Sequence, residues 1–156
     1  MNILYAQEAL LSPAGGLFLA GPTPRDPQVP SWRPAALAAL AKAGYTGTVY
    51  VPEDRNGGFN GRYDAQVAWE WAALEAAVVV LFWVPRDLAT LPGFTTNVEF
   101  GLYVRSGKAV LGYPPGAPKM RYLHSLADRF ACPVQHTLTD TIKTALAALE
   151  KTPLSR

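Results

Sequence analysis

The stretch that decides the fold is "VVVLFWVP", residues 78–85, in which every position is apolar. A strand with one face in water alternates apolar and polar side chains, whereas an unbroken apolar strand is buried on both faces. Burial on both faces is typical of the centre of a parallel sheet. The stretch therefore predicts a central strand of an α/β domain.

Strand-like and helix-like segments alternate on both sides of this stretch. Further strands are predicted at 16–22, 47–52, 108–114 and, as a short edge strand, 132–137. Helices are predicted at 32–44, 64–77, 95–107, 118–130 and 140–151. This strict alternation predicts one doubly wound, flavodoxin- or Rossmann-like α/β domain over residues 1–156, with its core at about 16–150 and a five-stranded parallel sheet flanked by helices.

The composition narrows the classes of function. Of the 156 residues, 49% are apolar and 17% are charged, the formal net charge is +2, and the basic residues are scattered. A nucleic-acid partner is not expected, because it would need clustered positive charge. Cys132 is the only cysteine, so no internal disulfide is expected. A chain without disulfides suits a reducing compartment, and we therefore expect a cytoplasmic location. The apolar runs are too short for a bilayer and "MNILYAQEALL" lacks a signal-peptide pattern, so no membrane partner is expected.

Ligands of doubly wound sheets bind beyond the carboxyl ends of the strands, near the point where the strand order reverses. Two long loops, 53–63 and 86–94, lie at this edge, and loops of that length are often functional. The helix after the second loop carries Glu99 near its start, where a helix N-terminus favours an ionised carboxylate. Thr96 and Glu99 also fit a capping box, in which Glu99 would serve only its own helix.

Several familiar signatures are missing. The sequence contains no G-x-G-x-x-G, no G-x-x-x-x-G-K-[ST] and no G-x-S-x-G motif. His124 and His136 have no partner at metal-ligand spacing, so neither a metal nor an organic cofactor is expected. The carboxylates, amides and aromatics that remain suit chemistry at a sugar carbon, where a carboxylate attacks an oxocarbenium-like centre and an acid assists the leaving group.

Three segments carry a resemblance to a known family: "LFLAGPTPR" (17–25), "QVAWEWAALEAAVVVLFWVPRD" (66–87) and "TTNVEFG" (95–101). They resemble the nucleoside 2-deoxyribosyltransferase family, and more closely its nucleoside 2-deoxyribosyltransferase-like branch. The resemblance covers roughly residues 16–112.

This resemblance implies a mechanism and partners. Glu99 would be the nucleophile that attacks the anomeric carbon of a (deoxy)nucleoside, releases the base, and holds the sugar until a second base or water takes it. Glu70 and Asp87 are the positions that could match the family's acids, which bind and protonate the base. The partners implied are a nucleoside or nucleotide, a free nucleobase and further copies of the chain in a homo-oligomer.

Seven further residues are candidates for substrate binding: Phe18, Gly21, Pro22, Arg25, Trp83, Arg86 and Asn97. The resemblance puts Phe18 at the sugar site, and Gly21 beside Pro22 would let a ligand approach the backbone. Trp83 at the end of its strand could stack on a nucleobase. The two arginines could hold a 5′-phosphate, and Asn97 a sugar hydroxyl or phosphate.

Each candidate also has a purely structural interpretation, which the sequence leaves open. Glu70 would be a solvated helix residue between packed tryptophans, and Asp87 would order its own turn. The aromatics would be core, the arginines solvated loop charges, and Asn97 a polar residue of the first helical turn. Two functional alternatives also stay open: an N-glycosidase that hydrolyses a nucleoside monophosphate, and a non-catalytic nucleotide-binding module.

Overall fold

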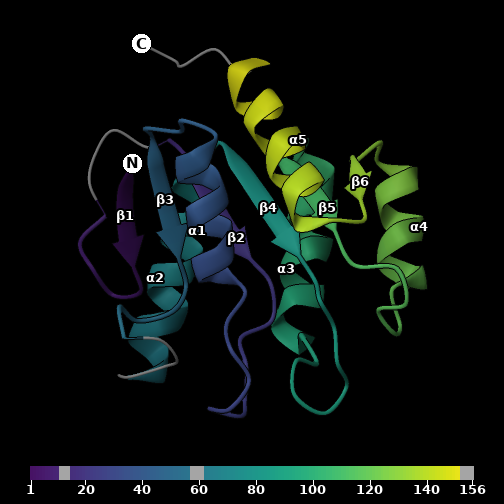
Figure 1. Cartoon of the computed structure of the whole chain (residues 1–156), viewed down its shortest axis with the longest axis horizontal. Coiled ribbons are helices and arrows are strands. Elements are labelled where there is room, and N and C mark those ends of the chain that lie inside the picture. Colours follow the sequence, from purple (N-terminus) through teal and green to yellow (C-terminus); the bar gives the residue numbers. More distant parts are fainter. Residues whose placement is uncertain (11–14, 57–61, 152–156) are drawn as a thin grey trace.

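A computed structural model describes residues 1–10, 15–56 and 62–151, and its centre is a single parallel sheet. The strands are β1 (Asn2–Tyr5), β2 (Leu17–Ala20), β3 (Thr48–Val51), β4 (Val79–Trp83), β5 (Ala109–Gly112) and β6 (Val134–Gln135). They pair in the order β1-β3-β2-β4-β5-β6, and every pairing is parallel (Figure 1). The predicted doubly wound α/β fold is confirmed.

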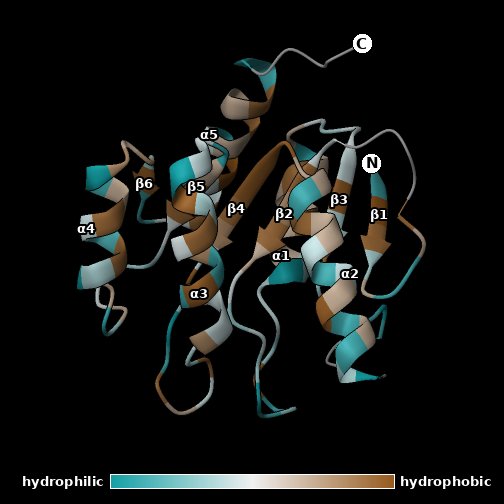
Figure 2. Ribbon diagram, turned by 180° about the vertical axis from the view of Figure 1, so that it is seen from behind, coloured by the Kyte–Doolittle hydropathy of each residue, from teal (hydrophilic) through white to brown (hydrophobic). Residues whose placement is uncertain are grey.

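Strand β4 lies in the middle of the sheet, as its unbroken apolar sequence predicts. All five of its residues are buried, and it pairs with β2 on one side and β5 on the other. Figure 2 shows β2 and β4 as hydrophobic ribbons enclosed between helices. The strand is therefore held by hydrogen bonds at both edges and by apolar contacts on both faces.

Helices cover both faces of the sheet. They are α1 (Arg33–Lys42), α2 (Tyr63–Ala76), α3 (Phe94–Tyr103), α4 (Arg121–Arg129) and α5 (Leu138–Lys151), with a short 3₁₀ turn, η1 (Val104–Ser106), after α3. One core cluster joins the sheet to α2, α3 and α4, and a second joins its opposite face to α1 and α5. The two views of the chain show the same division (Figures 1 and 2).

The number of strands differs from the prediction. The sheet has six strands among the described residues, not five, because β1 (Asn2–Tyr5) pairs in register with β3 at the sheet edge. The strand is four residues long and only Leu4 within it is buried, so its short apolar stretch is a weak signal compared with that of β4. Part of the predicted loop 53–63, residues 57–61, lies outside the described residues.

The strand order reverses between β2 and β4. From β2 the chain crosses through α1 to β3 on one side, and from β4 it crosses through α3 to β5 on the other. The loops that leave these two neighbouring strands therefore diverge and leave a crevice at the carboxyl edge, the usual ligand site of such sheets. In the described part of the chain, each helix is too short or too polar to traverse a bilayer.

Candidate active site

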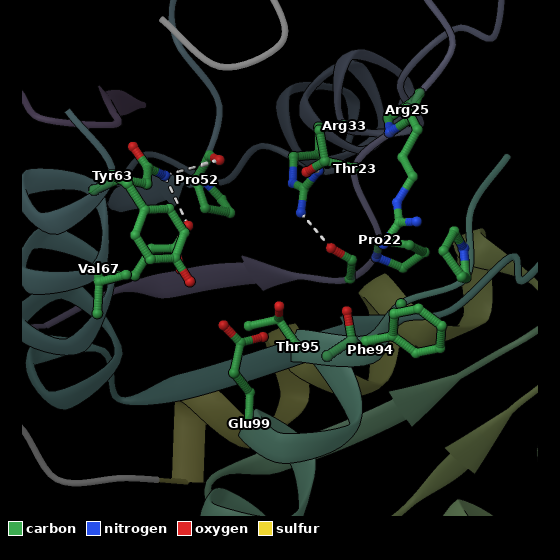
Figure 3. A pocket seen from close by; sticks show the side chains of 17 residues that line it. Pro22, Thr23, Arg25, Arg33, Pro52, Tyr63, Val67, Phe94, Thr95 and Glu99 are labelled. Atoms are coloured by element: carbon green, nitrogen blue, oxygen red, sulfur yellow. Dashed lines mark hydrogen bonds between the residues drawn. The ribbon is translucent and has the colours of Figure 1, made fainter. Parts of the chain in front are cut away.

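A cavity of about 430 Å³ opens at this reversal point (Figure 3). Its walls are formed by the β2–α1 loop and the start of α1, the residue after β3, the N-terminal half of α2, and the end of the β4–α3 loop with the N-terminal half of α3. The lining residues are Gly21, Pro22, Thr23, Pro24, Arg25, Arg33, Pro52, Tyr63, Gln66, Val67, Glu70, Pro92, Gly93, Phe94, Thr95, Thr96 and Glu99. Both predicted glutamates are therefore brought to one cavity.

Glu99 lies in the second turn of α3, and its side chain points into the cavity (Figure 3). The helix begins at Phe94, directly after Gly93, whose φ of 66° is left-handed and suits a residue without a side chain. Thr96 is therefore already inside the helix, and no hydrogen bond holds the Glu99 carboxyl group among the described residues. The structure contradicts the capping-box interpretation.

Burial gives Glu99 an unusual ionisation. Loss of water contact, followed by repulsion from the Glu70 carboxylate, raises the pKa of Glu99 to about 8, and the positive charge of Arg33 only partly opposes this. The usual pKa of a glutamate carboxyl group is 4.5, well below neutral pH, whereas burial brings that of Glu99 above it.

Glu70 projects from α2 into the same cavity. Gln66, one turn earlier, donates a hydrogen bond from Nε2 to the Glu70 carboxylate (2.7 Å) and another to the carbonyl oxygen of Pro52 (3.3 Å). Burial raises the pKa of Glu70, although the bond from Gln66 and the charge of Arg33 act in the opposite direction. Glu70 is thus not a solvated helix residue, and burial raises the pKa of both glutamates in the cavity.

Arg33 is the buried cation of the site, with 1% of its surface exposed. Its Nε donates to the carbonyl oxygen of Leu19 (3.1 Å) and its Nη2 to that of Gly21 (2.7 Å). Its Nη1 donates to Thr23 Oγ1 (3.1 Å) and to Glu53 Oε1 (2.5 Å). The guanidinium group is therefore fixed against the residues through which β2 leaves the sheet.

The β2–α1 loop forms the opposite rim of the cavity, and Gly21, Pro22 and Arg25 all line it. A Cβ on Gly21 would lie 2.2 Å from the carbonyl oxygen of Trp83, and the φ of this residue is 153°. The glycine is thus required by packing within the protein itself. Arg25 is exposed at the rim of the cavity, and its guanidinium group lies over the exposed ring of Phe94, 5.3 Å from its centroid.

Asp87 does not join the two glutamates. It is exposed, and its Oδ1 accepts hydrogen bonds from the amides of Ala89 (3.0 Å) and Thr90 (2.8 Å) and from Thr90 Oγ1 (2.9 Å). These bonds lower the pKa of Asp87, so it is a poor proton donor. The structure supports the interpretation that Asp87 orders its own turn.

Phe18 and Trp83 are packed in the core and are not among the described residues that line the cavity. Phe18 belongs to the cluster beneath α2, where its ring centroid lies 6.5 Å from that of Trp69. Trp83 faces the other side of the sheet, in the cluster that contains residues of α1 and α5. Neither ring is therefore available to a ligand in this cavity, contrary to the sequence-based expectation.

Arg86 and Asn97 pair with each other outside the cavity lining. Arg86 Nη2 donates to Asn97 Oδ1, and Nη1 donates to the carbonyl oxygen of Lys119 (3.0 Å). Arg86 is buried, with 6% of its surface exposed. These contacts tie α3 to the segment that precedes α4, so the pair has a structural role in place of the expected contact with phosphate or sugar.

Arg33, Gln66 and Tyr63 are among the lining residues that the sequence did not point to. Gln66 stands four residues before Glu70, a spacing that brings helical side chains into contact and could have identified it. Arg33 stands at the start of a predicted helix, where the helix dipole disfavours a cation. This unfavourable position was the only feature of the sequence that could have identified it. Among the described residues, no group of three or more His, Cys, Asp or Glu side chains is arranged to hold a metal ion.

Comparison with known proteins identifies a family for this chain. A family model described as "Nucleoside 2-deoxyribosyltransferase like" matches residues 15–117, about two thirds of the chain. The matched region contains the β2–α1 loop, α2, β4 and α3, and with them every residue that lines the cavity. No curated protein matches the chain significantly. On the family match, the chain belongs to the nucleoside 2-deoxyribosyltransferase-like family.

Proposed function

We propose that this protein cleaves the N-glycosidic bond of a nucleoside or nucleotide and transfers the sugar to a second base. The observation that carries the proposal is that Glu99 and Glu70, from two different helices, face one cavity at the reversal point of the sheet. Enzymes that carry out substitution at an anomeric carbon usually use two carboxyl groups in one cavity, one as the nucleophile and one as the acid.

The reaction uses the two glutamates in opposite protonation states. The ionised Glu99 attacks C1′, the C1′–N bond breaks with its electron pair leaving on the base, and Glu70 gives its proton to that base. A nitrogen of the incoming base then attacks C1′, releases Glu99 and returns its proton to Glu70. Because burial raises the pKa of Glu99 to about 8, the proposed mechanism requires Glu99 to be ionised and Glu70 to be protonated when substrate is bound.

The cavity also suits a nucleoside in size and lining. About 430 Å³ lies within the range of roughly 300–1,000 Å³ that is typical of small-molecule sites. Val67 and Tyr63 on one side, with Pro22 and Phe94 on the other, offer apolar and aromatic surface to a base or sugar (Figure 3). No metal or organic cofactor takes part in the proposed steps.

The second candidate is hydrolysis of a nucleoside monophosphate, with water in place of the second base. The observation that favours it is Arg25, whose guanidinium group lies at the rim of the cavity over Phe94. An arginine fork binds a phosphate group through two parallel hydrogen bonds, and a 5′-phosphate would extend from the sugar toward the rim.

We also propose that the protein assembles as a homo-oligomer in the cytoplasm. Phe94, Val98 and Leu102 form an exposed apolar stripe along α3, with a spacing of four residues, and Phe94 also borders the cavity. A second copy would bury this stripe. Light scattering coupled to gel filtration measures the assembly, and a monomer at micromolar concentration would refute it.

A chromatographic base-exchange assay tests the proposed reaction. The protein is incubated with each of the four 2′-deoxynucleosides or their monophosphates together with a different free base. A transferase yields the exchanged nucleoside, and a hydrolase yields only free base and free sugar. Turnover is expected to be lost in Glu99→Gln and retained in Asp87→Asn, the matched control outside the cavity. Turnover by Glu99→Gln at the wild-type rate, or no product from any substrate, would overturn the proposal.

A further inference from the structure

The position of Arg33 is costly for a purely structural residue. It is the first residue of α1, where the positive end of the helix dipole repels a cation, and its guanidinium group has almost no contact with water. An apolar side chain of similar volume would pack there without either penalty. A buried cation at this position therefore implies a nearby negatively charged group with which it interacts.

Glu53 is one such partner, and it lies behind Arg33 with respect to the main cavity. The two groups are joined at 2.5 Å, and Ser31 Oγ donates to both carboxylate oxygens of Glu53 (2.9 Å each). Glu53 is not among the described residues that line the main cavity. With Arg33 and Ser31 it lines a second, smaller cavity of about 130 Å³. Arg33 thus separates Glu53 on one side from the catalytic cavity on the other.

Of the groups that surround Glu99 in the described part of the chain, Arg33 is the only buried cation. Glu70 faces Glu99 from α2, and Tyr103 lies one turn later on α3. Tyr63 and Arg25 lie at the exposed rim, where water screens the charge of the Arg25 guanidinium group. Arg33 lies across the cavity from Glu99 (Figure 3), and its four hydrogen bonds prevent the guanidinium group from turning away.

We propose that Arg33 is a positioning residue for the reaction: its fixed charge, attenuated by Glu53 from behind, keeps one of Glu70 and Glu99 ionised while the other holds a proton. This inference rests on the proposed function, because only a reaction that needs one carboxylate and one carboxylic acid uses this state. Two ionised carboxylates would leave no acid for the departing base, and two protonated ones would leave no nucleophile.

The proposal predicts shifts of opposite sign for two neighbouring substitutions. Glu53→Gln keeps the shape and an acceptor for Arg33 but removes the opposing negative charge, so the ionisation of Glu99 moves to lower pH, by roughly half a unit. Arg33→Met removes the cation, so the ionisation of Glu99 moves to higher pH, by about one unit. Arg33→Lys keeps the charge and is expected to lie between Arg33→Met and the wild type.

The measurement is a carbon-13 NMR titration of protein labelled at the glutamate carboxyl groups, with the Glu99 signal identified by its loss in Glu99→Gln. The same shifts are expected in the basic limb of the pH–rate profile. A role in folding alone would lower stability in both variants without moving the titration. An unmoved or upward titration in Glu53→Gln overturns the proposal even if Arg33→Met does not fold. Because the titration needs no substrate, it separates this inference from a failure of the proposed function.

Discussion

Replacing Glu99 by glutamine is expected to make the protein more stable, and increasingly so as the pH rises. The pKa of Glu99 is raised from 4.5 to about 8, so between these values the folded chain holds a proton that the unfolded chain has released. Folding is then coupled to proton uptake, and the wild-type protein loses stability as the pH rises through this window. Glutamine carries no charge at any pH and does not have this penalty.

The size of the effect follows from the shift. One pKa unit corresponds to about 1.4 kcal/mol, so complete ionisation of Glu99 in the folded protein costs on the order of 5 kcal/mol. At pH 7 the expected cost is about 3 kcal/mol, and at pH 5 it is less than about 1 kcal/mol. These are upper limits, because the glutamine amide must also be desolvated in the cavity.

Urea unfolding of the wild type and Glu99→Gln at pH 5, 7 and 8.5 measures this difference in the free energy of unfolding. Asp87→Asn is the matched control with the opposite sign. Its carboxylate is stabilised by hydrogen bonds that lower its pKa, so its loss reduces stability by an amount that stays constant above pH 5. A difference between Glu99→Gln and the wild type that does not change from pH 5 to 8.5 would refute the burial of this carboxyl group.

Three other substitutions test the roles assigned to single residues. Gly21→Ala brings a Cβ to 2.2 Å from the Trp83 carbonyl oxygen, so it should lower the free energy of unfolding in urea by about 1–3 kcal/mol; an unchanged value would contradict this packing. Trp83→Ala should lower the free energy of unfolding by about 3–5 kcal/mol because Trp83 is packed in the core. A variant that keeps its stability but has a raised KM would instead show that Trp83 stacks on the base. Arg25→Ala should raise KM for monophosphates at least about tenfold relative to nucleosides if the rim binds phosphate, and equal changes would exclude that.

Much of the fold could be predicted because the strands that build its centre carry strong local signals. The unbroken apolar run of β4 and the alternation of strands with helices suffice for the parallel sheet and its reversal point. Strand β1 could not be predicted in the same way. It has one buried residue, Leu4, and it becomes a strand by pairing with β3, a long-range contact that its short apolar stretch alone does not reveal.

Within the site, sequence position predicted which edge a residue occupies but not the direction of its side chain. Glu99 was found from its place at the start of a helix beyond a strand end and from the family resemblance, and Glu70 from the resemblance alone; both line the cavity. Trp83 and Phe18 lie on strands that enclose the same crevice, yet strand side chains alternate between faces, and both of these enter the core. Arg33 was missed because arginine is rarely buried, and its partner Glu53 is supplied by a segment twenty residues away.

The most direct test of the central claim is the mass of the intermediate on Glu99. Wild-type protein is quenched with acid during turnover of a nucleoside that shows base release, digested, and analysed by mass spectrometry. The account predicts a peptide containing Glu99 that is heavier by one sugar residue, and no such adduct in Glu99→Gln. A sugar adduct on another residue, or base release by Glu99→Gln as fast as by the wild type, would contradict it.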